Sequence, residues 1–165
     1  MKGEKVNMKE ILIWIFVLVL SLILNSCAPL VKTDLQSLKD NPEKYQGKIV
    51  IITTDIKSVF EAPGAYLGKK IELKGYVEYK GFREFRNWNF ILKDKEGRSI
   101  RCYEREYRVE AWIIPVMAIR KAARNNEQLT VVGKLQKGLK IELDWIEYEG
   151  LIIDTDFKPF RVKIG

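Results

Sequence analysis

The chain has 165 residues, and its apolar fraction of 47% is enough to build the core of one domain. The formal net charge is +7, from 29 basic and 22 acidic residues, which favours anionic partners, although lysines interspersed with glutamates are also typical of an ordinary solvated surface. The absence of histidine excludes His-dependent catalytic triads and His-ligated zinc or haem sites, and two cysteines are too few for a cysteine-rich metal site.

The first part of the chain is predicted to be an export signal. The run from Ile11 to Leu24 is uncharged and contains no helix breaker. Its length suits the apolar region of a signal peptide, about 7–15 residues, better than a membrane span of about 20 residues. Three lysines precede the run and provide the positive leading edge of such a signal. We therefore expect residues 1–26 to direct the chain out of the cytoplasm.

The end of this apolar run carries a candidate lipidation site. Leu24-Asn25-Ser26-Cys27 resembles a bacterial lipobox, in which signal peptidase II cuts before a cysteine that receives a diacylglyceryl group. The resemblance implies cleavage between Ser26 and Cys27 and a stable membrane anchor, because two or more acyl chains hold a protein where one does not. The alternative is an uncleaved signal anchor with Cys27 near the edge of the bilayer. Both readings predict residues 28–165 on a membrane and outside the cytoplasm, in the periplasm or at the outer surface.

Two segments, 33–48 and 54–69, repeat at an offset of twenty-one residues. Identical Thr, Asp, Ser, Pro, Tyr, Gly and Lys residues recur in register, and each copy leads into a β-rich run. Either the threonine or the aspartate that opens each copy can cap a short helical turn, and the proline ends that turn. The repeat predicts two units, each a helical turn followed by a strand. Chance similarity between two turn-rich segments is the alternative.

Beyond residue 69 apolar side chains recur mainly at every second position, which predicts strands. The period becomes helical over 110–125, where Pro115 favours a start near itself. The segments 94–97 and 137–138 are typical of hairpin turns. In chain order the predicted elements are strand 70–80, strand 87–94, strand 98–104, helix 110–125, strand 129–136 and strand 139–147, with one or two edge strands in the tail.

This order resembles an OB-fold, a five-stranded Greek-key barrel with a helix between its third and fourth strands. GKKIELKGYV resembles the first OB strand, NFILKDKEGRSIRCY the second-to-third hairpin, and QLTVVGKL the fourth strand. The stretch is similar to the tRNA-anticodon-like OB domains of small bacterial envelope proteins. The predicted fold class is therefore mainly β. The predicted division of the chain is a lipoprotein signal at 1–26, a tether and first repeat unit at 27–53, an OB-fold-like barrel at 54–148 and a C-terminal tail with edge strands at 149–165.

OB-folds usually bind ligands across their second and third strands and the adjoining loops, so the resemblance implies a binding surface there. The candidate residues are Tyr76, Arg83, Arg86, Asn89, Lys93, Arg101 and Tyr103, with Tyr79 beside Tyr76. Basic side chains next to aromatic rings suit single-stranded nucleic acid, but the same pattern is expected on any solvated barrel exterior. Envelope proteins, or a glycan or peptide, are the more expected partners, because a surface lipoprotein rarely meets nucleic acid.

The tryptophans and the second cysteine are assigned to structure. Trp88, Trp112 and Trp145 each fall on the apolar side of their element and are expected in the core. Cys102 shares the side of Ile100 and is expected to be a small buried hydrophobe.

Carboxylates near the last predicted barrel strand are the best candidates for catalysis. Glu142 and Asp144 project from one side of that strand, as a divalent-metal hydrolase would need, but Lys140 shares the side and a solvated charge ladder explains the set equally well. We therefore expect no enzyme activity, no metal and no cofactor. The predicted function is that of a non-catalytic, membrane-anchored lipoprotein whose OB-fold domain contacts proteins or other envelope components. The alternatives are binding of an anionic polymer and, last, the hydrolase.

Overall fold

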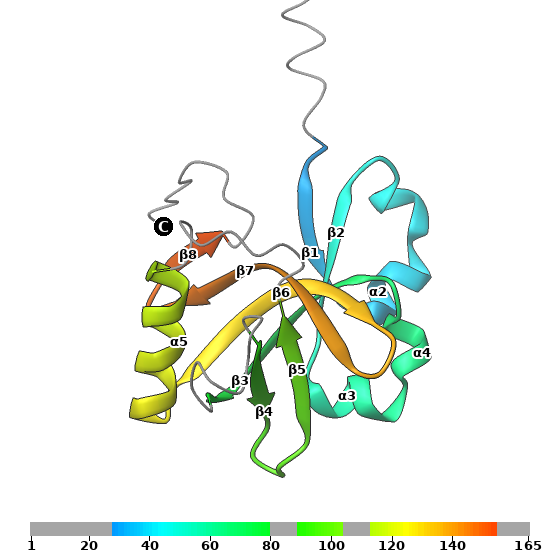
Figure 1. Cartoon of the computed structure of the whole chain (residues 1–165). Coiled ribbons are helices and arrows are strands. Elements are labelled where there is room, and N and C mark those ends of the chain that lie inside the picture. The colour runs from blue at the N-terminus through cyan, green and yellow to red at the C-terminus, as the bar shows by residue number, and fades with distance from the viewer. Residues whose placement is uncertain (1–27, 80–88, 104–112, 155–165) are drawn as a thin grey trace, which may run out of the picture.

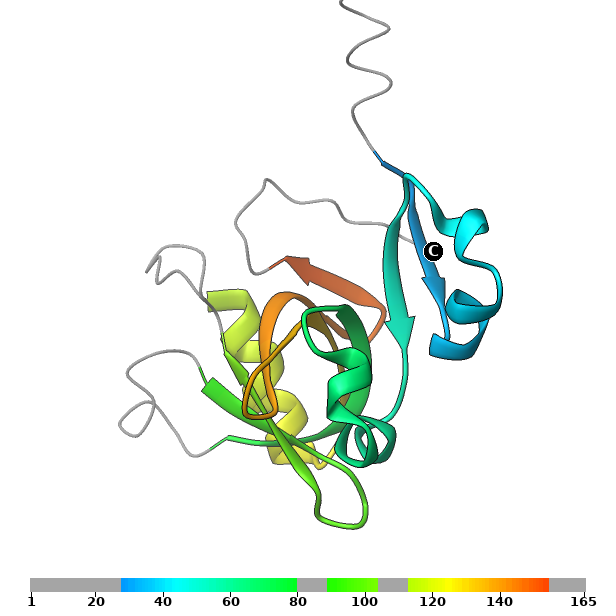
Figure 2. The same cartoon turned by 90° about the vertical axis from the view of Figure 1, so that its right-hand side faces the viewer.

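The computed structural model describes residues 28–79, 89–103 and 113–154 as strands joined by short helices and turns (Figure 1, Figure 2). The predicted signal at 1–26, Cys27, Trp88 and Trp112 lie outside these residues. The elements in chain order are β1 (Leu30–Thr33), α2 (Leu35–Asp40), η1 (Pro42–Tyr45), β2 (Ile49–Thr53), α3 (Ile56–Glu61), α4 (Pro63–Tyr66), β3 (Lys70–Glu78), β4 (Asn89–Lys93), β5 (Ser99–Tyr103), α5 (Ile113–Asn125), β6 (Gln128–Gln136), β7 (Lys140–Tyr148) and β8 (Leu151–Asp154). The barrel strands begin and end within two residues of the predicted bounds, and α5 begins two residues before Pro115, close to its predicted start.

Five of the strands close into a barrel. β3 pairs antiparallel with β4 and with β6, β4 pairs antiparallel with β5, and β6 pairs antiparallel with β7. A parallel pairing of β5 with β7 completes the ring. α5 lies between β5 and β6 in the chain and packs at one side of the barrel against β3, β6, β7 and β8 (Figure 1). The predicted mainly β, OB-fold-like barrel with a helix between its third and fourth strands is confirmed.

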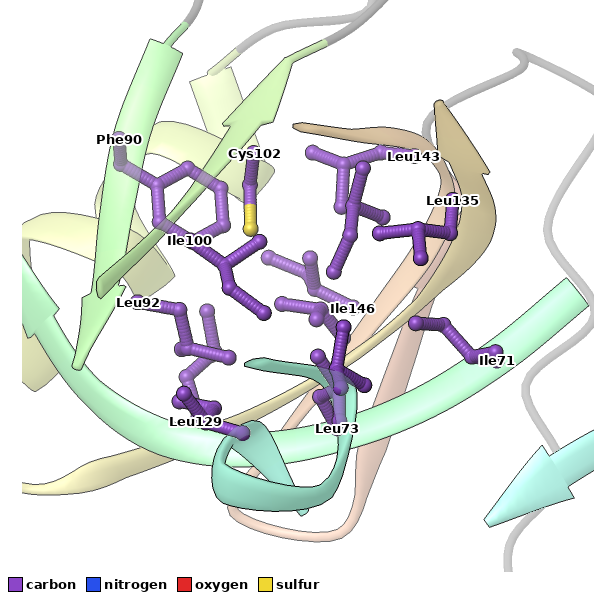
Figure 3. Packing of buried hydrophobic residues seen from close by; sticks show 14 of the residues in the cluster. Ile71, Leu73, Phe90, Leu92, Ile100, Cys102, Leu129, Leu135, Leu143 and Ile146 are labelled. Atoms are coloured by element: carbon purple, nitrogen blue, oxygen red, sulfur yellow. The ribbon is translucent and has the colours of Figure 1, made fainter. Parts of the chain in front are cut away.

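Alternating side chains from the five barrel strands fill the interior (Figure 3). Ile71 and Leu73 of β3 point inward together with Phe90 and Leu92 of β4, and each of the four is at most 1% exposed. Cys102 of β5 lies among them, and burial raises the pKa of its thiol far above the usual range. The prediction that Cys102 is a small buried hydrophobe is confirmed, and a thiol held protonated in an apolar core has little nucleophilic reactivity.

A β-bulge changes which side of β7 faces the core. The pairing of β6 with β7 shifts by one residue next to Gly133, so Leu143 and Ile146, three positions apart, both point inward (Figure 3). Trp145 therefore lies on the other side of the strand, partly buried, with the Lys70 ammonium 5.6 Å from the centroid of its ring. The prediction that Trp145 lies in the core is wrong, because strict alternation does not survive the extra residue of the bulge.

The two copies of the sequence repeat form the same cap twice. Asp34 Oδ1 accepts a hydrogen bond from the Ser37 backbone N–H at 2.7 Å, and Asp55 Oδ1 accepts one from the Ser58 N–H at 2.6 Å. Each aspartate is the N-cap of a six-residue helix. Of the two predicted capping residues in each copy, the aspartate is therefore the one that caps.

The threonine of each copy does not cap the helix, and its hydroxyl contacts the hydroxyl of a tyrosine. The Thr33 and Tyr45 hydroxyl oxygens are 2.8 Å apart, and the Thr54 hydroxyl donates to the Tyr66 hydroxyl at 3.2 Å. Both tyrosines are buried. Each hydroxyl pair ties the end of one strand to the turn that leads into the next strand. The matched caps and hydroxyl pairs support a true structural repeat over chance similarity.

The repeat units extend the sheet beyond the barrel. β1, β2 and β3 pair in parallel, so each unit is a crossover that carries the chain to the next strand in the same direction. The sequence predicts the helical turns and the strands but not this parallel pairing. As a result β3 belongs both to the barrel and to a short parallel sheet that contains the first described residues.

Gly133 is predicted to tolerate no side chain. A Cβ at this position would lie 2.1 Å from the Glu142 carbonyl oxygen and 2.7 Å from Ile141 Cγ2. Because a backbone oxygen on the neighbouring strand cannot yield without loss of the β6–β7 ladder, we expect Gly133→Ala to lower the free energy of unfolding by about 3 kcal/mol. Urea unfolding followed by circular dichroism measures this change. Gly64→Ala is the matched control, since nothing lies within 4 Å of a Cβ there, and equal losses in the two variants would contradict the prediction.

Asp55 is predicted to link stability to acid pH. The hydrogen bond from the Ser58 backbone lowers the pKa of the Asp55 carboxyl below its ordinary value of 3.8. The ionised cap therefore stabilises the fold above about pH 4, and this contribution is lost as the pH falls through the lowered folded-state pKa. We expect Asp55→Ala to lower the unfolding free energy by about 1 kcal/mol at neutral pH.

We expect Asp55→Asn, which keeps a capping oxygen without the charge, to make the decline in acid shallower. Urea unfolding at a series of pH values compares both variants with Asp40→Asn, a control at the end of α2. An acid slope for Asp55→Asn identical to that of the unmodified chain would speak against this linkage.

Candidate binding face

The predicted binding residues that the structure describes lie on three adjacent barrel strands. They are Tyr76 on β3, Asn89 and Lys93 on β4, and Arg101 and Tyr103 on β5. The backbone of Asn89 pairs with that of Tyr103 at the start of β4. Arg83 and Arg86 lie outside the described residues. The register therefore brings the described part of the predicted site together on one region of the barrel.

Two neighbours that the sequence prediction omitted complete this region. Tyr76 lies opposite Lys93, and Ile91 lies between Glu78 on one side and Arg101 on the other. The alternation of side chains along a strand is enough to place both residues on this side of the sheet. Glu78 is two residues beyond Tyr76, and Ile91 is two residues before Lys93. We refer to the outward side chains of Tyr76, Glu78, Ile91, Lys93, Arg101 and Tyr103 as the β3–β5 face.

Charges of both signs meet on the β3–β5 face. Lys93 forms an ion pair with Glu78, so its positive charge is balanced within the face. Arg101 is exposed, and Lys140 of β7 lies opposite it in the register. Glu142 follows two residues later on β7 and brings a second carboxylate to this region. The described part of the face is therefore a mixture of cations and anions and not a continuous cationic track.

Tyr79, which the sequence prediction grouped with Tyr76, lies elsewhere. It directly follows β3, packs against the core and carries the Arg120 guanidinium 5.6 Å from the centroid of its ring. A cavity of about 370 Å³ beside α5 is lined by Tyr79, Arg120, Ala123 and Arg124. This hollow belongs to the side of the barrel that α5 covers and not to the β3–β5 face.

The carboxylates considered for metal-dependent hydrolysis have partners on other strands. Glu142 Oε2 accepts a hydrogen bond from Gln136 Nε2 of β6 at 2.7 Å, and Asp144 Oδ2 lies 2.8 Å from Lys70 Nζ of β3. Within the described ranges no cluster of three or more His, Cys, Asp or Glu side chains could hold a metal ion. Both carboxylates are partly buried, and each contacts a side chain of another strand.

Glu78 is predicted to restrain the binding of polyanions. Glu78→Gln removes the carboxylate that balances Lys93, which adds one cation that can pair with a sulfate or phosphate. We expect this variant to bind labelled heparin more tightly, with a logarithmic salt slope that is steeper by up to about one unit. Fluorescence anisotropy at several salt concentrations measures both quantities. Glu61→Gln removes the same charge from α3, and an equal gain in this control would assign the effect to net charge alone.

The comparisons with other proteins do not identify a function. Among the residues that the structure describes, no helix is long and apolar enough to cross a membrane. No model of a known protein family matches the chain, and no curated protein matches it in sequence. A function can therefore be inferred only from the side chains that this barrel exposes.

Proposed function

We propose that this chain is a lipoprotein, anchored outside the cytoplasm through Cys27, whose barrel binds a protein of the cell envelope through the β3–β5 face. The observation that supports this most directly is the composition of the face. Tyr76, Ile91 and Tyr103 are partly exposed, Arg101 is exposed, and the charge of Lys93 is already paired with Glu78. Tyrosine and arginine are enriched at protein interfaces and dominate their binding energy.

The filled interior supports recognition on the outside of the barrel. Side chains from all five strands occupy the space that a larger barrel would offer to a ligand (Figure 3). The outward side chains then carry the specificity. One cation and one anion of the β3–β5 face are already paired with each other. Burying this face under another protein therefore leaves fewer charges unpaired, which suits a protein as the binding partner.

Binding of an anionic polymer is the second candidate. It is favoured by the net charge of +6 from Cys27 onward, with 26 basic and 20 acidic residues, and by the adjacent Arg101 and Lys140. The two candidates differ in their response to salt. Binding of a polyanion weakens by orders of magnitude as salt rises, whereas an interface built on tyrosine and isoleucine responds weakly.

The proposal is tested by site-specific photocrosslinking of the full chain in its own membranes. A photoreactive phenylalanine derivative replaces Tyr103 in one variant and Gln36, exposed on α2, in a matched control. We expect a specific covalent adduct to a protein from position 103 and none from position 36. With the partner purified, Arg101→Ala should weaken its affinity at least tenfold, and Lys57→Ala on α3 should change it less than twofold.

Three results would contradict this function, and a fourth would support the alternative. Equal crosslinking at positions 103 and 36, or unchanged affinity after Arg101→Ala, would show that the β3–β5 face is not the binding site. If the mass of the intact protein includes no acyl chains on Cys27, the proposed anchor is refuted. A thousandfold loss of affinity between low and high salt would instead support the anionic polymer.

A further inference from the structure

We propose that the end of the sheet where β1 and β2 begin lies directly against the phospholipid surface that holds the anchor. The contact is made by Leu30, Lys48 and Ile49, which we call the membrane-proximal edge. This inference rests on the proposed function, because it takes Cys27 to carry the acyl chains.

The link between the anchor and the fold is short. Only Ala28 and Pro29 separate Cys27 from Leu30, the first residue of β1. Three residue steps span at most about 11 Å, and the headgroup layer on one side of a bilayer is about 5–7 Å thick. The start of β1 can therefore rise only a few ångströms above the headgroups.

The fold shortens this link further. The backbone N–H of Ile49 donates to the Pro29 carbonyl at 3.0 Å, so Pro29 is already held by the first residue of β2. Ala28 is then the one residue between Cys27 and the hydrogen-bonded sheet. Acylation of Cys27 would consequently restrict both the height and the orientation of the barrel.

Two apolar side chains are exposed at this edge. Leu30 is 49% exposed and Ile49 is 43% exposed, and the two are direct partners in the β1–β2 register. Single exposed apolar residues are common on proteins, but this pair includes Leu30, which follows the proposed anchor by only three residues in the sequence. Contact with the boundary between headgroups and acyl chains would remove both side chains from water.

A cation accompanies the apolar pair. Lys48 is exposed in the turn before β2, and its backbone N–H donates to the Tyr45 carbonyl at 3.1 Å, which holds the turn in place. Lys32 of β1, in contrast, is paired with Glu72 of β3. An exposed ammonium next to two apolar side chains suits the anionic headgroups of a phospholipid surface.

The direction of the strands then orients the molecule. β1 and β2 run parallel away from this edge, and the hairpin between β4 and β5 lies at the opposite end of the molecule (Figure 1, Figure 2). The hairpin would therefore project into the aqueous phase, and the β3–β5 face beside it would stay accessible to a partner.

The test uses the full acylated chain, reconstituted into vesicles of phosphatidylethanolamine and phosphatidylglycerol. A nitroxide label on Ile49→Cys is compared with labels on Glu96→Cys, in the β4–β5 hairpin, and on Ile152→Cys, exposed on β8. Cys102 is buried and acylation blocks the Cys27 thiol, so each variant carries one reactive thiol. Electron paramagnetic resonance measures how often each label collides with oxygen, which concentrates in the lipid, and with a nickel chelate, which stays in water. The ratio of the two collision rates gives the depth of the label in the bilayer. Lys48→Cys is the second variant if Ile49→Cys does not fold.

We expect the ratio of oxygen to chelate collisions at position 49 to be at least three times that at position 96. Equal ratios, in a chain whose mass includes acyl chains on Cys27, would overturn this inference and leave the anchoring intact. Deeper immersion of position 152 than of position 49 would also overturn it. A mass without acyl chains would refute the anchoring itself and this inference with it.

Discussion

The antiparallel ladder between β3 and β6 is the interaction on which the rest of the structure depends. Seven residue pairs join these strands, and without them the order β3-β4-β5-β7-β6 would be an open sheet with two unpaired edges. Closure bends β3 so that its last residues pair with β4 while its first residues pair with β6. Gly75 lies at this bend, where a Cβ would be 2.7 Å from the Lys93 carbonyl oxygen, and glycine allows the close approach.

Closure of the barrel also determines which side chains remain available to bind a partner. Five strands enclose a space that their own apolar side chains fill (Figure 3). The polar side chains that alternate with them are turned outward, and there the register determines which of them meet. Lys93 and Glu78 become an ion pair by this means, and Arg101 comes to lie beside Ile91. The character of the β3–β5 face is thus a consequence of strand pairing.

β3 connects the barrel to the N-terminal units. It pairs with β2 at Ile52–Ile71 and Thr53–Glu72, and the Lys32–Glu72 ion pair joins β1 to β3 across β2. The first described residues are therefore part of the same hydrogen-bonded sheet as the barrel. A membrane anchor at Cys27 would act on this sheet through a very short link, and the barrel could not turn independently of it.

The sequence by itself determined the local structure of this protein. Alternating apolar residues predicted the barrel strands, and the repeat predicted that the threonine or the aspartate opening each copy caps a helical turn. Such preferences can be predicted because they arise from contacts between residues close in the chain, and the structure shows that the aspartate is the cap in both copies. Only the tertiary structure decided the outward position of Trp145, the Lys93–Glu78 pair and the parallel pairing of β1 with β2. Each of these depends on the register between paired strands, and a single extra residue in a bulge reverses the side on which a residue lies.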